Sequence, residues 1–321
     1  MTEYQPGVTV IVPTYKRTAD LDRCLAAIDT QTLKAVEVLI TYRADDEETQ
    51  GYLARTARPA AGARLLLCEE PGVVYALNKA FDAVRTEFFA ITDDDAVPNA
   101  DWLARIVAHF ESDPSAAAVG GKDYVYADGR WMEGAETEVG RVLWFGLLIG
   151  HHHVGAGPAR YVESLKGVNL AFRTSAFGAL RLDTRLRGKG AQVGWEMQLT
   201  LSLIVQGHKI IYDPQVLVKH FCGWRPIEED RTHFNPISHG DEVYNRTLIL
   251  MEYLGSQRWG WLRRAMLLTY IGLRGSRRVP GLLLLVAGLV TRYPNSWMRF
   301  KTTIAACRDA VATARPRLEV R

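Results

Sequence analysis

Three adjacent carboxylates, Asp93, Asp94 and Asp95, follow directly on the apolar run at residues 88–91. Mg²⁺ and Mn²⁺ take oxygen ligands, and enzymes usually share such ions with substrate phosphates instead of enclosing them in protein. The triplet therefore indicates a divalent cation held together with a nucleotide diphosphate. Acid clusters also occur in solvated turns and at helix N-caps, and the triplet by itself leaves those interpretations open.

The elements that would position the triplet follow a βαβ pattern over the first 120 residues. Short runs rich in β-branched residues alternate there with amphipathic helical patterns, which is typical of a parallel sheet with crossover helices. We expect strands at residues 8–12, 36–41, 64–68 and 88–92, and helices at residues 20–30, 47–58, 75–84 and 102–111. The triplet then lies at the carboxyl end of a central parallel strand, where open α/β sheets bind their ligands.

Later residues, from about 120 to 221, have an α+β pattern. We expect strands near residues 117–126, 169–173 and 209–212, a helix at 196–206, a loop at 221–236 and a further helix at 240–254. Gly207 is suited to the C-cap of the helix at 196–206. Glu196 opens that helix, at a position where the helix dipole favours a carboxylate whatever its function.

Five motifs, in this order, resemble those of family 2 of the GT-A glycosyltransferases, and they span residues 8–221. They are VTVIVPTYKR at 8–17, GVVYALNKA at 72–80, DDD at 93–95, KGVNLAFR at 166–173, and GWEMQL at 194–199 with GHKIIYDP at 207–214 and His220 after it. The resemblance implies an α/β GT-A fold, in which a Rossmann-like nucleotide-binding half at 1–120 is fused to an α+β acceptor half at 121–225. It predicts a catalytic domain at 1–225, followed by a helical region at 226–321.

The resemblance also assigns roles to individual residues. Glu196 matches the position of the catalytic base, and Asp95 that of the principal metal ligand, with Asp93 and His220 beside it. The expected contacts with the nucleotide fall on Pro13, Thr14, Tyr15, Arg17, Arg43, Asp46, Asn78, Asp93 and Asp94. The sugar and acceptor region falls on Lys166, Asn169 and Trp195.

Two positions depart from the family pattern. Residues 42–45 read YRAD where the family usually has Asp-Asp-Gly-Ser, so the carboxylate that normally contacts the base is missing. Either Asp45 or Asp46 would replace it, or Arg43 would bind the diphosphate. The family's Glu-Asp pair falls on Trp195-Glu196, so the base is one methylene longer and an aromatic residue precedes it.

The reaction implied by the resemblance is a single inverting displacement. A carboxylate takes the proton of an acceptor hydroxyl while that oxygen attacks the anomeric carbon, and Mg²⁺ or Mn²⁺ stabilises the departing nucleoside diphosphate. We therefore expect a metal-dependent inverting hexosyltransferase that moves a sugar from a UDP- or GDP-linked donor. The expected acceptor is lipid-linked or a polysaccharide, in the biosynthesis of a cell-surface glycan.

Two other classes of protein share some of these features. A sugar-nucleotide pyrophosphorylase shares the early fold and the metal, but it needs a Gly-rich triphosphate loop near the first strand, which residues 13–17 (PTYKR) do not supply. A non-catalytic protein that binds nucleotide sugars or nucleic acid could use the basic tail. The leucine-rich segments of that tail count against nucleic acid as a partner.

The tail at residues 256–321 differs in charge from the rest of the chain. It holds thirteen Lys or Arg residues against two acids, within a chain whose total charge is only +3. Apolar helical segments at 259–273 and 279–290 are bounded by arginines, and the longest run without charge has 13 residues, below the ~20 needed to cross a bilayer. These features predict helices that lie on an anionic membrane surface. Packing on the body or on another subunit, which would make a homo-oligomer, is the alternative.

The cysteines, the N-terminal residues and a histidine triplet lead to three further expectations. The four cysteines have no CxxC spacing, which fits a reducing cytosol and argues against a zinc site. The N-terminal residues lack the pattern of a secretory signal. We therefore expect a peripheral protein at the cytoplasmic face of the plasma membrane. The triplet His151–His153 favours a flap that contacts the acceptor over a structural metal site, because adjacent histidines point in different directions.

Overall fold

The computed structural model describes residues 4–56, 62–222, 234–276 and 279–318. The first part of the chain alternates strands and helices: β1 (Gln5–Pro13), α1 (Thr18–Asp29), β2 (Glu37–Arg43), α2 (Glu47–Leu53), β3 (Ala63–Cys68), α3 (Val73–Ala83), β4 (Thr86–Ile91), β5 (Ala96–Pro98) and α4 (Trp102–Ser112). Strands β1 to β4 pair in parallel, in the order β4-β1-β2-β3. The predicted α/β class is confirmed.

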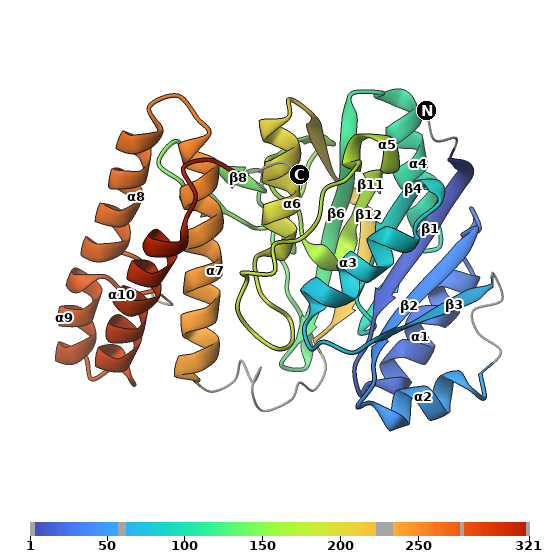
Figure 1. Cartoon of the computed structure of the whole chain (residues 1–321), viewed down its shortest axis with the longest axis horizontal. Helices are drawn as coiled ribbons and strands as arrows, with labels where there is room; N and C mark the ends of the chain where they lie inside the picture. The colour runs from blue at the N-terminus through green and yellow to red at the C-terminus, as the bar shows by residue number, and fades with distance from the viewer. Residues whose placement is uncertain (1–3, 57–61, 223–233, 277–278, 319–321) are drawn as a thin grey trace.

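The next part of the chain completes the sheet. It supplies β6 (Ala116–Ala127), β7 (Arg130–Trp131), β8 (Arg141–Val142), β9 (Leu148–Ile149), β10 (Arg160–Tyr161), the 3-10 helix η1 (Gly167–Asn169), β11 (Leu170–Arg173), α5 (Thr174–Phe177), α6 (Trp195–Val205) and β12 (Lys209–Phe221). One sheet of ten strands results, with the path β10-β12-β6-β11-β4-β1-β2-β3 and with β5 beside β12 and β7 beside β6. Because β11 runs antiparallel between β4 and β6, it joins the two halves (Figure 1).

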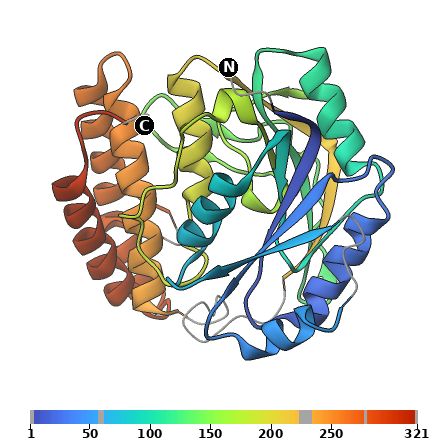
Figure 2. The same cartoon turned by 45° about the vertical axis from the view of Figure 1, so that its right-hand side comes forward.

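Helices cover both faces of this sheet, which explains why the early strands are apolar on both sides. Successive residues of a strand point to opposite faces. In β1, Val10 and Val12 pack with Leu21 of α1 and Trp102 of α4, whereas Ile11 packs in a second core with α3 and α6. The turned view in Figure 2 shows α3 on one side of the twisted sheet and α1 on the other.

Two predicted elements differ most from the structure in length. The strand expected at 209–212 continues to Phe221, because β12 pairs in parallel with β6 up to the register Phe221↔Tyr126. Its pairing shifts between Asp213 and Leu217, around Pro214, which is the residue that suggested an end to the strand. The helix expected at 47–58 ends at Leu53, and the last two residues of that prediction lie outside the described residues.

Four helices follow: α7 (Pro236–Gly255), α8 (Gly260–Leu273), α9 (Leu282–Val290) and α10 (Ser296–Thr313). They stand together beyond α6 in both views (Figures 1 and 2). Val243 and Leu248 of α7 belong to the same hydrophobic core as the sheet, so α7 is an integral part of the body. The predicted division between 225 and 226 lies outside the described residues and stays a prediction.

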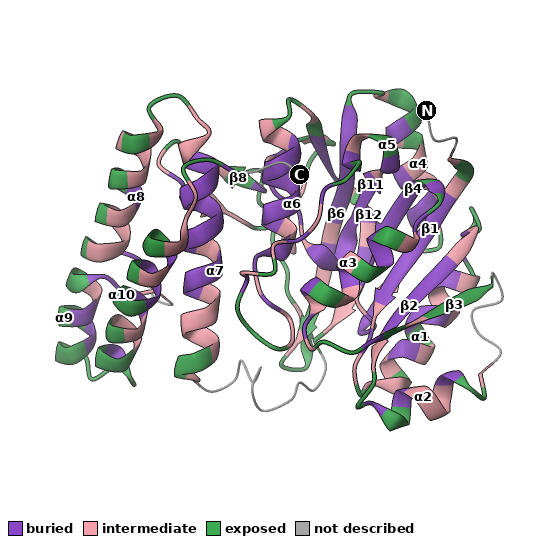
Figure 3. Cartoon of the chain, viewed as in Figure 1, coloured by how far each residue is buried: buried purple, intermediate pink, exposed green. Residues whose placement is uncertain are grey.

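The outer helices α8, α9 and α10 carry many exposed apolar side chains. Purple, buried residues fill the sheet and the upper part of α7, whereas green, exposed residues recur along α8, α9 and α10 (Figure 3). The sequence predicted a helical region at 226–321 but did not delimit α10 within it, because its apolar residues alternate with polar ones without a clear stripe. In the described residues, no helix combines the length and apolarity that a membrane crossing requires.

The end of the described chain returns to the interior and binds α7. Glu252 is a buried carboxylate that pairs with Arg185 at 2.9 Å and accepts the backbone N–H of Arg315 at 2.9 Å. Arg264 of α8 donates from Nη2 to the carbonyl oxygens of Arg315, at 2.9 Å, and Pro316, at 2.7 Å. These contacts fix the segment after α10 against α7 and α8.

Candidate active site

The aspartate triplet lies in the turn between β4 and β5, at the carboxyl end of the central parallel strands. Thr92 continues the β4 ladder by donating its N–H to the carbonyl of Ile11 at 3.1 Å. β5 then pairs antiparallel with β12 in the register His220↔Ala96, and the N–H of Phe221 binds the carbonyl of Asp95 at 2.9 Å. The long strand β12 therefore brings a histidine beside the triplet.

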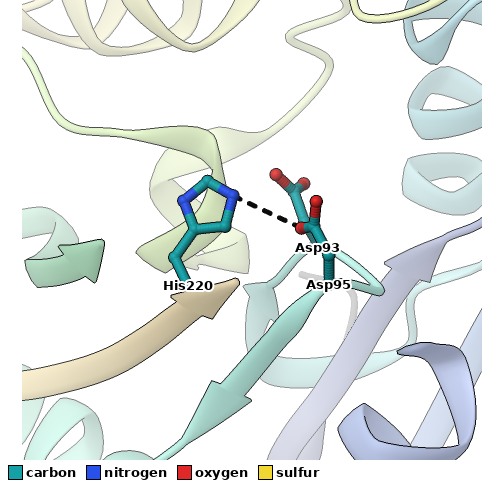
Figure 4. A group of neighbouring side chains, drawn as sticks. All are labelled: Asp93, Asp95 and His220. Carbon is teal, nitrogen blue, oxygen red and sulfur yellow. Dashed lines mark ion pairs between the residues drawn. The ribbon is translucent and has the colours of Figure 1, made fainter. Parts of the chain in front are cut away.

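Asp93, Asp95 and His220 form a potential metal centre (Figure 4). One ligand atom from each lies within 4.8 Å of the other two, and Nε2 of His220 is 3.3 Å from Oδ1 of Asp95. Two carboxylates and one imidazole suit Mn²⁺ and are compatible with Mg²⁺, which prefers oxygen ligands throughout. The donor set therefore fits the predicted ion, and the predicted ligands do come together.

The charge state of His220 depends on these carboxylates. Burial favours the neutral imidazole, but the close contact with the Asp95 carboxylate and the charges of Asp95 and Asp93 outweigh it, so the pKa of His220 is raised above its ordinary value. A proton and a metal ion compete for the same imidazole nitrogen. The ion would thus bind most tightly where this histidine is neutral.

Arg17 is the internal counter-charge of the triplet. Its guanidinium binds Asp94 at 2.5 Å and Asp95 at 2.7 Å, and Thr14 donates its hydroxyl to Asp94 at 2.8 Å. Burial alone would lower the pKa of Arg17, but the neighbouring aspartates raise it. Burial raises the pKa of the Asp94 carboxyl against the opposing effect of Arg17. Asp94 thus faces Thr14 and Arg17 and fixes the loop after β1 on the triplet.

The next predicted nucleotide contacts lie in the loops after β1 and β2, which pack against each other. Pro13 ends β1. Two residues later, the ring of Tyr15 packs against the guanidinium of Arg43, with 4.2 Å between the ring centroid and Cζ. Arg43 also binds Asp45 at 2.6 Å. Asp46 is fully buried and accepts from the N–H of Lys16 at 2.6 Å, besides capping α2. Of the two suggested substitutes for the missing family carboxylate, Asp45 is the one that faces solvent.

Two predicted ligand contacts, Asn78 and Asn169, already bind the protein through their amides. Asn78 donates to the carbonyl of Leu182 at 2.9 Å and accepts its N–H at 2.8 Å. Asn169 accepts from the indole of Trp102 at 2.9 Å and donates to the carbonyl of Val216 at 2.8 Å. The structure gives both amides a role in holding segments together, and contact with a ligand stays a prediction.

The predicted base, Glu196, lies in the first turn of α6. Gly194 has φ 104°, a left-handed conformation that favours glycine, and it turns the chain into the helix. Glu196 is 3.9 Å from Nζ of Lys166, with 14% of its side chain exposed. Trp195 is only 6% exposed, and a Cβ on Gly167 would meet its ring at 2.2 Å. The Trp195 indole therefore packs against η1 and is almost entirely buried.

A profile described as "Glycosyl transferase family 2" matches residues 9–181, more than half of the chain. The chain belongs to glycosyltransferase family 2. This membership makes it a glycosyltransferase, and the pyrophosphorylase and non-catalytic alternatives give way to that class. The family match ends before Glu196, so the base position depends on the resemblance of the motifs and on the geometry above.

Two curated relatives come from the archaeon Haloferax volcanii. A glucosyl-dolichyl phosphate glucuronosyltransferase is 26% identical over 237 residues, which are 71% of this chain and 72% of the relative. The glycosyltransferase AglE is 25% identical over 132 residues, which are 40% of this chain and 43% of that protein. Both are named as enzymes that transfer sugars.

Solved glycosyltransferase structures share the fold. The mannosyltransferase PcManGT from Pyrobaculum calidifontis, in complex with GDP-Man and Mn²⁺, has a TM-score of 0.53 and 18% identity, covering 97% of this chain and 87% of its own. S. aureus TarS 1-349, in complex with UDP-GlcNAc, has a TM-score of 0.55 and 13% identity, covering 96% and 91%. The GT-A expectation for the fold is confirmed.

Several features near the candidate site were not foreseen from the sequence. Asp123 of β6 is 5% exposed, and its only sequence signal is a charged pair, Lys122-Asp123, inside a mostly apolar strand. His152 is buried and binds the carbonyl of Ser164 at 2.8 Å, whereas His151 lies at the surface. Arg17 was predicted as a nucleotide contact, but its pairing with two aspartates was not foreseen.

Proposed function

We propose that this glycosyltransferase is metal-dependent and inverting, and that its donor is a UDP- or GDP-linked sugar. The observation that carries the proposal is the pairing of two separate groups. The chain has a cluster with a cation's ligands, Asp93, Asp95 and His220, and a carboxylate at the sequence position expected for a base, Glu196, in the first turn of α6. The solved structures with GDP-Man and Mn²⁺ or with UDP-GlcNAc support a nucleotide-sugar donor for this chain as well.

The chain's own residues divide the reaction between them. Asp93, Asp95 and His220 would hold Mn²⁺ or Mg²⁺, which when bound supplies positive charge for a leaving diphosphate. Arg17 adds a fixed cation beside them. Glu196 accepts the proton of the attacking hydroxyl at its carboxylate oxygen. Lys166, 3.9 Å away, is the cation beside this carboxylate.

A lipid-linked acceptor is the favoured second substrate, with a polysaccharide as the other. The relative from Haloferax volcanii is named for glucosyl-dolichyl phosphate, a lipid-linked sugar. The outer helices supply a surface for such a partner, because several of their apolar side chains face solvent. Trp261 is 71% exposed, Leu283 64% and Val290 79%. Arg263, Arg274 and Arg292 stand among them and suit anionic headgroups.

Donor turnover tests the donor and the metal together. The protein, stripped with EDTA, is incubated with a panel of UDP- and GDP-sugars, with and without Mn²⁺, and release of nucleoside diphosphate is measured. We expect release from one donor, restored by Mn²⁺ at least about tenfold. Equal release in EDTA would contradict metal dependence, and no release from any donor would contradict the donor class. The anomeric proton of the product, read by NMR, tests inversion.

Vesicle binding tests the proposed surface at residues 256–321. Replacing Val290 by Ser removes one exposed apolar side chain, worth about 1.5 kcal/mol when buried. We expect the partition onto vesicles that contain phosphatidylglycerol to fall about tenfold in a sedimentation assay. Ile237→Ser is the matched control, because Ile237 is 74% exposed but lies on α7. Equal losses of vesicle binding in both variants, or no loss in Val290→Ser, would contradict the proposal that α9 contacts the membrane.

A further inference from the structure

Asp123 is a buried carboxylate that neither the family motifs nor the proposed mechanism uses. It lies on β6 in register with Val218 of β12, two residues before the pair Val125↔His220. Side chains two residues apart on a strand share a face, and partners in register do so as well. Asp123 therefore points to the same face of the sheet as His220.

The surroundings of Asp123 are basic, yet its Oδ1 makes no hydrogen bond. Among the described residues, no donor reaches that buried atom. Burial raises the pKa of Asp123, and the positive charges of Lys166, His220 and His153 oppose the rise. A buried carboxylate without a hydrogen bond is costly. Its neighbours thus act on it by charge, and the Oδ1 atom keeps an unused capacity to accept a hydrogen bond.

The loop that contains His153 is fixed at this place by its neighbours. His152 binds the carbonyl of Ser164 at 2.8 Å, two residues before Lys166, and Tyr212 donates its hydroxyl to the carbonyl of His152 at 2.9 Å. Burial lowers the pKa of His152 to about 3, so this anchor stays neutral at physiological pH. The anchored loop holds His153 where its charge interacts with both Asp123 and Lys166.

Lys166 is held from the other side by η1. It precedes that short helix, and Asn169 at the end of η1 donates to the carbonyls of Lys122, at 3.2 Å, and Val216, at 2.8 Å. Lys122 is the neighbour of Asp123 in β6. Three segments that are far apart in the sequence, β6, the histidine loop and η1, therefore converge on one point, and Lys166 links that point to Glu196.

We infer that Asp123, His153 and Lys166 form a subsite that binds the hydroxyl groups of a sugar next to Glu196. A sugar hydroxyl can donate to the unpaired Asp123 oxygen and accept from Lys166 or His153, which satisfies all of these groups at once. A phosphate is disfavoured at this point because Asp123 would repel it. The inference rests on the proposed function, since the sugar belongs either to the donor or to the acceptor.

Kinetics of Asp123→Ala and Asp123→Asn test the subsite and identify the source of the sugar. The donor is the nucleotide sugar that the wild type hydrolyses, and the acceptor probes are octyl β-glucoside and octyl α-mannoside. Loss of a hydrogen bond to a buried carboxylate should reduce kcat/KM about tenfold or more in Asp123→Ala. Asp123→Asn keeps an accepting oxygen and should recover most of that loss. His153→Ala should act in the same direction with a smaller effect.

The assay has two arms, transfer to the octyl glycoside and hydrolysis of the donor without acceptor. Together they show whether the bound hydroxyl belongs to the donor or to the acceptor. If the hydroxyl belongs to the acceptor, Asp123→Ala raises the KM for the octyl glycoside and leaves donor hydrolysis without acceptor unchanged. If it belongs to the donor, hydrolysis and transfer fall by the same factor. Asp213→Asn and His239→Ala are the matched controls, because Asp213 is a strand carboxylate already bound to His109 at 2.7 Å and His239 of α7 binds Thr303 at 3.0 Å.

Parallel measurements keep the inference distinct from the proposed function. If Asp123→Ala behaves like the two controls in both arms, the subsite assignment is wrong. If the wild type turns over no donor, the proposed function fails, and the subsite is then read from saturation-transfer NMR of the octyl glycosides and of the UDP- and GDP-sugars, which needs no turnover. Signals that are equal in the wild type and in Asp123→Ala for every one of these ligands would overturn it there as well.

Discussion

The two sides of the site differ in how tightly the chain itself holds them. On the metal side, Asp94 and Asp95 are buried and bind Arg17 at 2.5 and 2.7 Å, and strand pairing fixes His220 beside them. On the acceptor side, Glu196 and Lys166 are 3.9 Å apart and both partly exposed. A rigid site suits the part of a donor that does not vary, the diphosphate, whereas looser contacts suit an acceptor that varies between enzymes.

Removing the central carboxylate of the rigid side should have the largest effect. Asp95→Ala takes away a metal ligand and a partner of both Arg17 and His220. We expect kcat/KM to fall by roughly 10³-fold or more, because the charge that stabilises the leaving group contributes several kcal/mol. Steady-state kinetics with Mn²⁺ titration measures it, and a circular dichroism spectrum controls for folding. Loss below tenfold would contradict the assigned role.

Changing the base on the open side should cost somewhat less. Glu196→Gln keeps the size of the side chain and removes its proton acceptor, so kcat should fall about 10²- to 10³-fold. Because Glu196 does not contact the metal cluster, the Mn²⁺ concentration for half-maximal activity should stay unchanged. A shift in that concentration together with kcat would show that the two sides are not independent.

Arg17→Ala tests whether the counter-charge is structural as well as catalytic. The substitution removes the guanidinium that pairs with two buried carboxylates, and we expect the free energy of unfolding in urea to fall by about 2–3 kcal/mol. Mn²⁺ at saturating concentration should recover part of this loss, since the ion replaces the missing charge. Arg23→Ala, on the exposed side of α1, is the control. Unchanged stability of Arg17→Ala would mean that the aspartates are solvated.

The smallest expected effect is a pH dependence of metal affinity. The raised pKa of His220 means that the protonated imidazole stabilises the metal-free fold below the unfolded value, and this contribution is lost as the pH rises through the folded pKa. Mn²⁺ needs the neutral form, so its apparent affinity should weaken by up to about tenfold per pH unit on acidification through that range. Calorimetric titration checks this, and His220→Ala should flatten the profile.

How much of the site could be predicted depends on the range of the interactions involved. Asp93 and Asp95 were placed correctly, because a strand pattern and the rule on strand ends depend only on local sequence. His220 was found by motif order, although the strand that carries it was predicted too short. Asp123, the pairing of Arg17 and the internal bonds of Asn78 were missed, because each depends on neighbours that only the folded sheet brings together.

The closure of the chain on Glu252 has a practical consequence for handling the protein. The segment around Arg315 binds Arg264 and Glu252, and α7, which carries Glu252, shares its core with the sheet. Shortening the chain after Thr313 would therefore remove the backbone N–H that Glu252 accepts, leaving that carboxylate with Arg185. A purification tag is better attached at the other end of the chain.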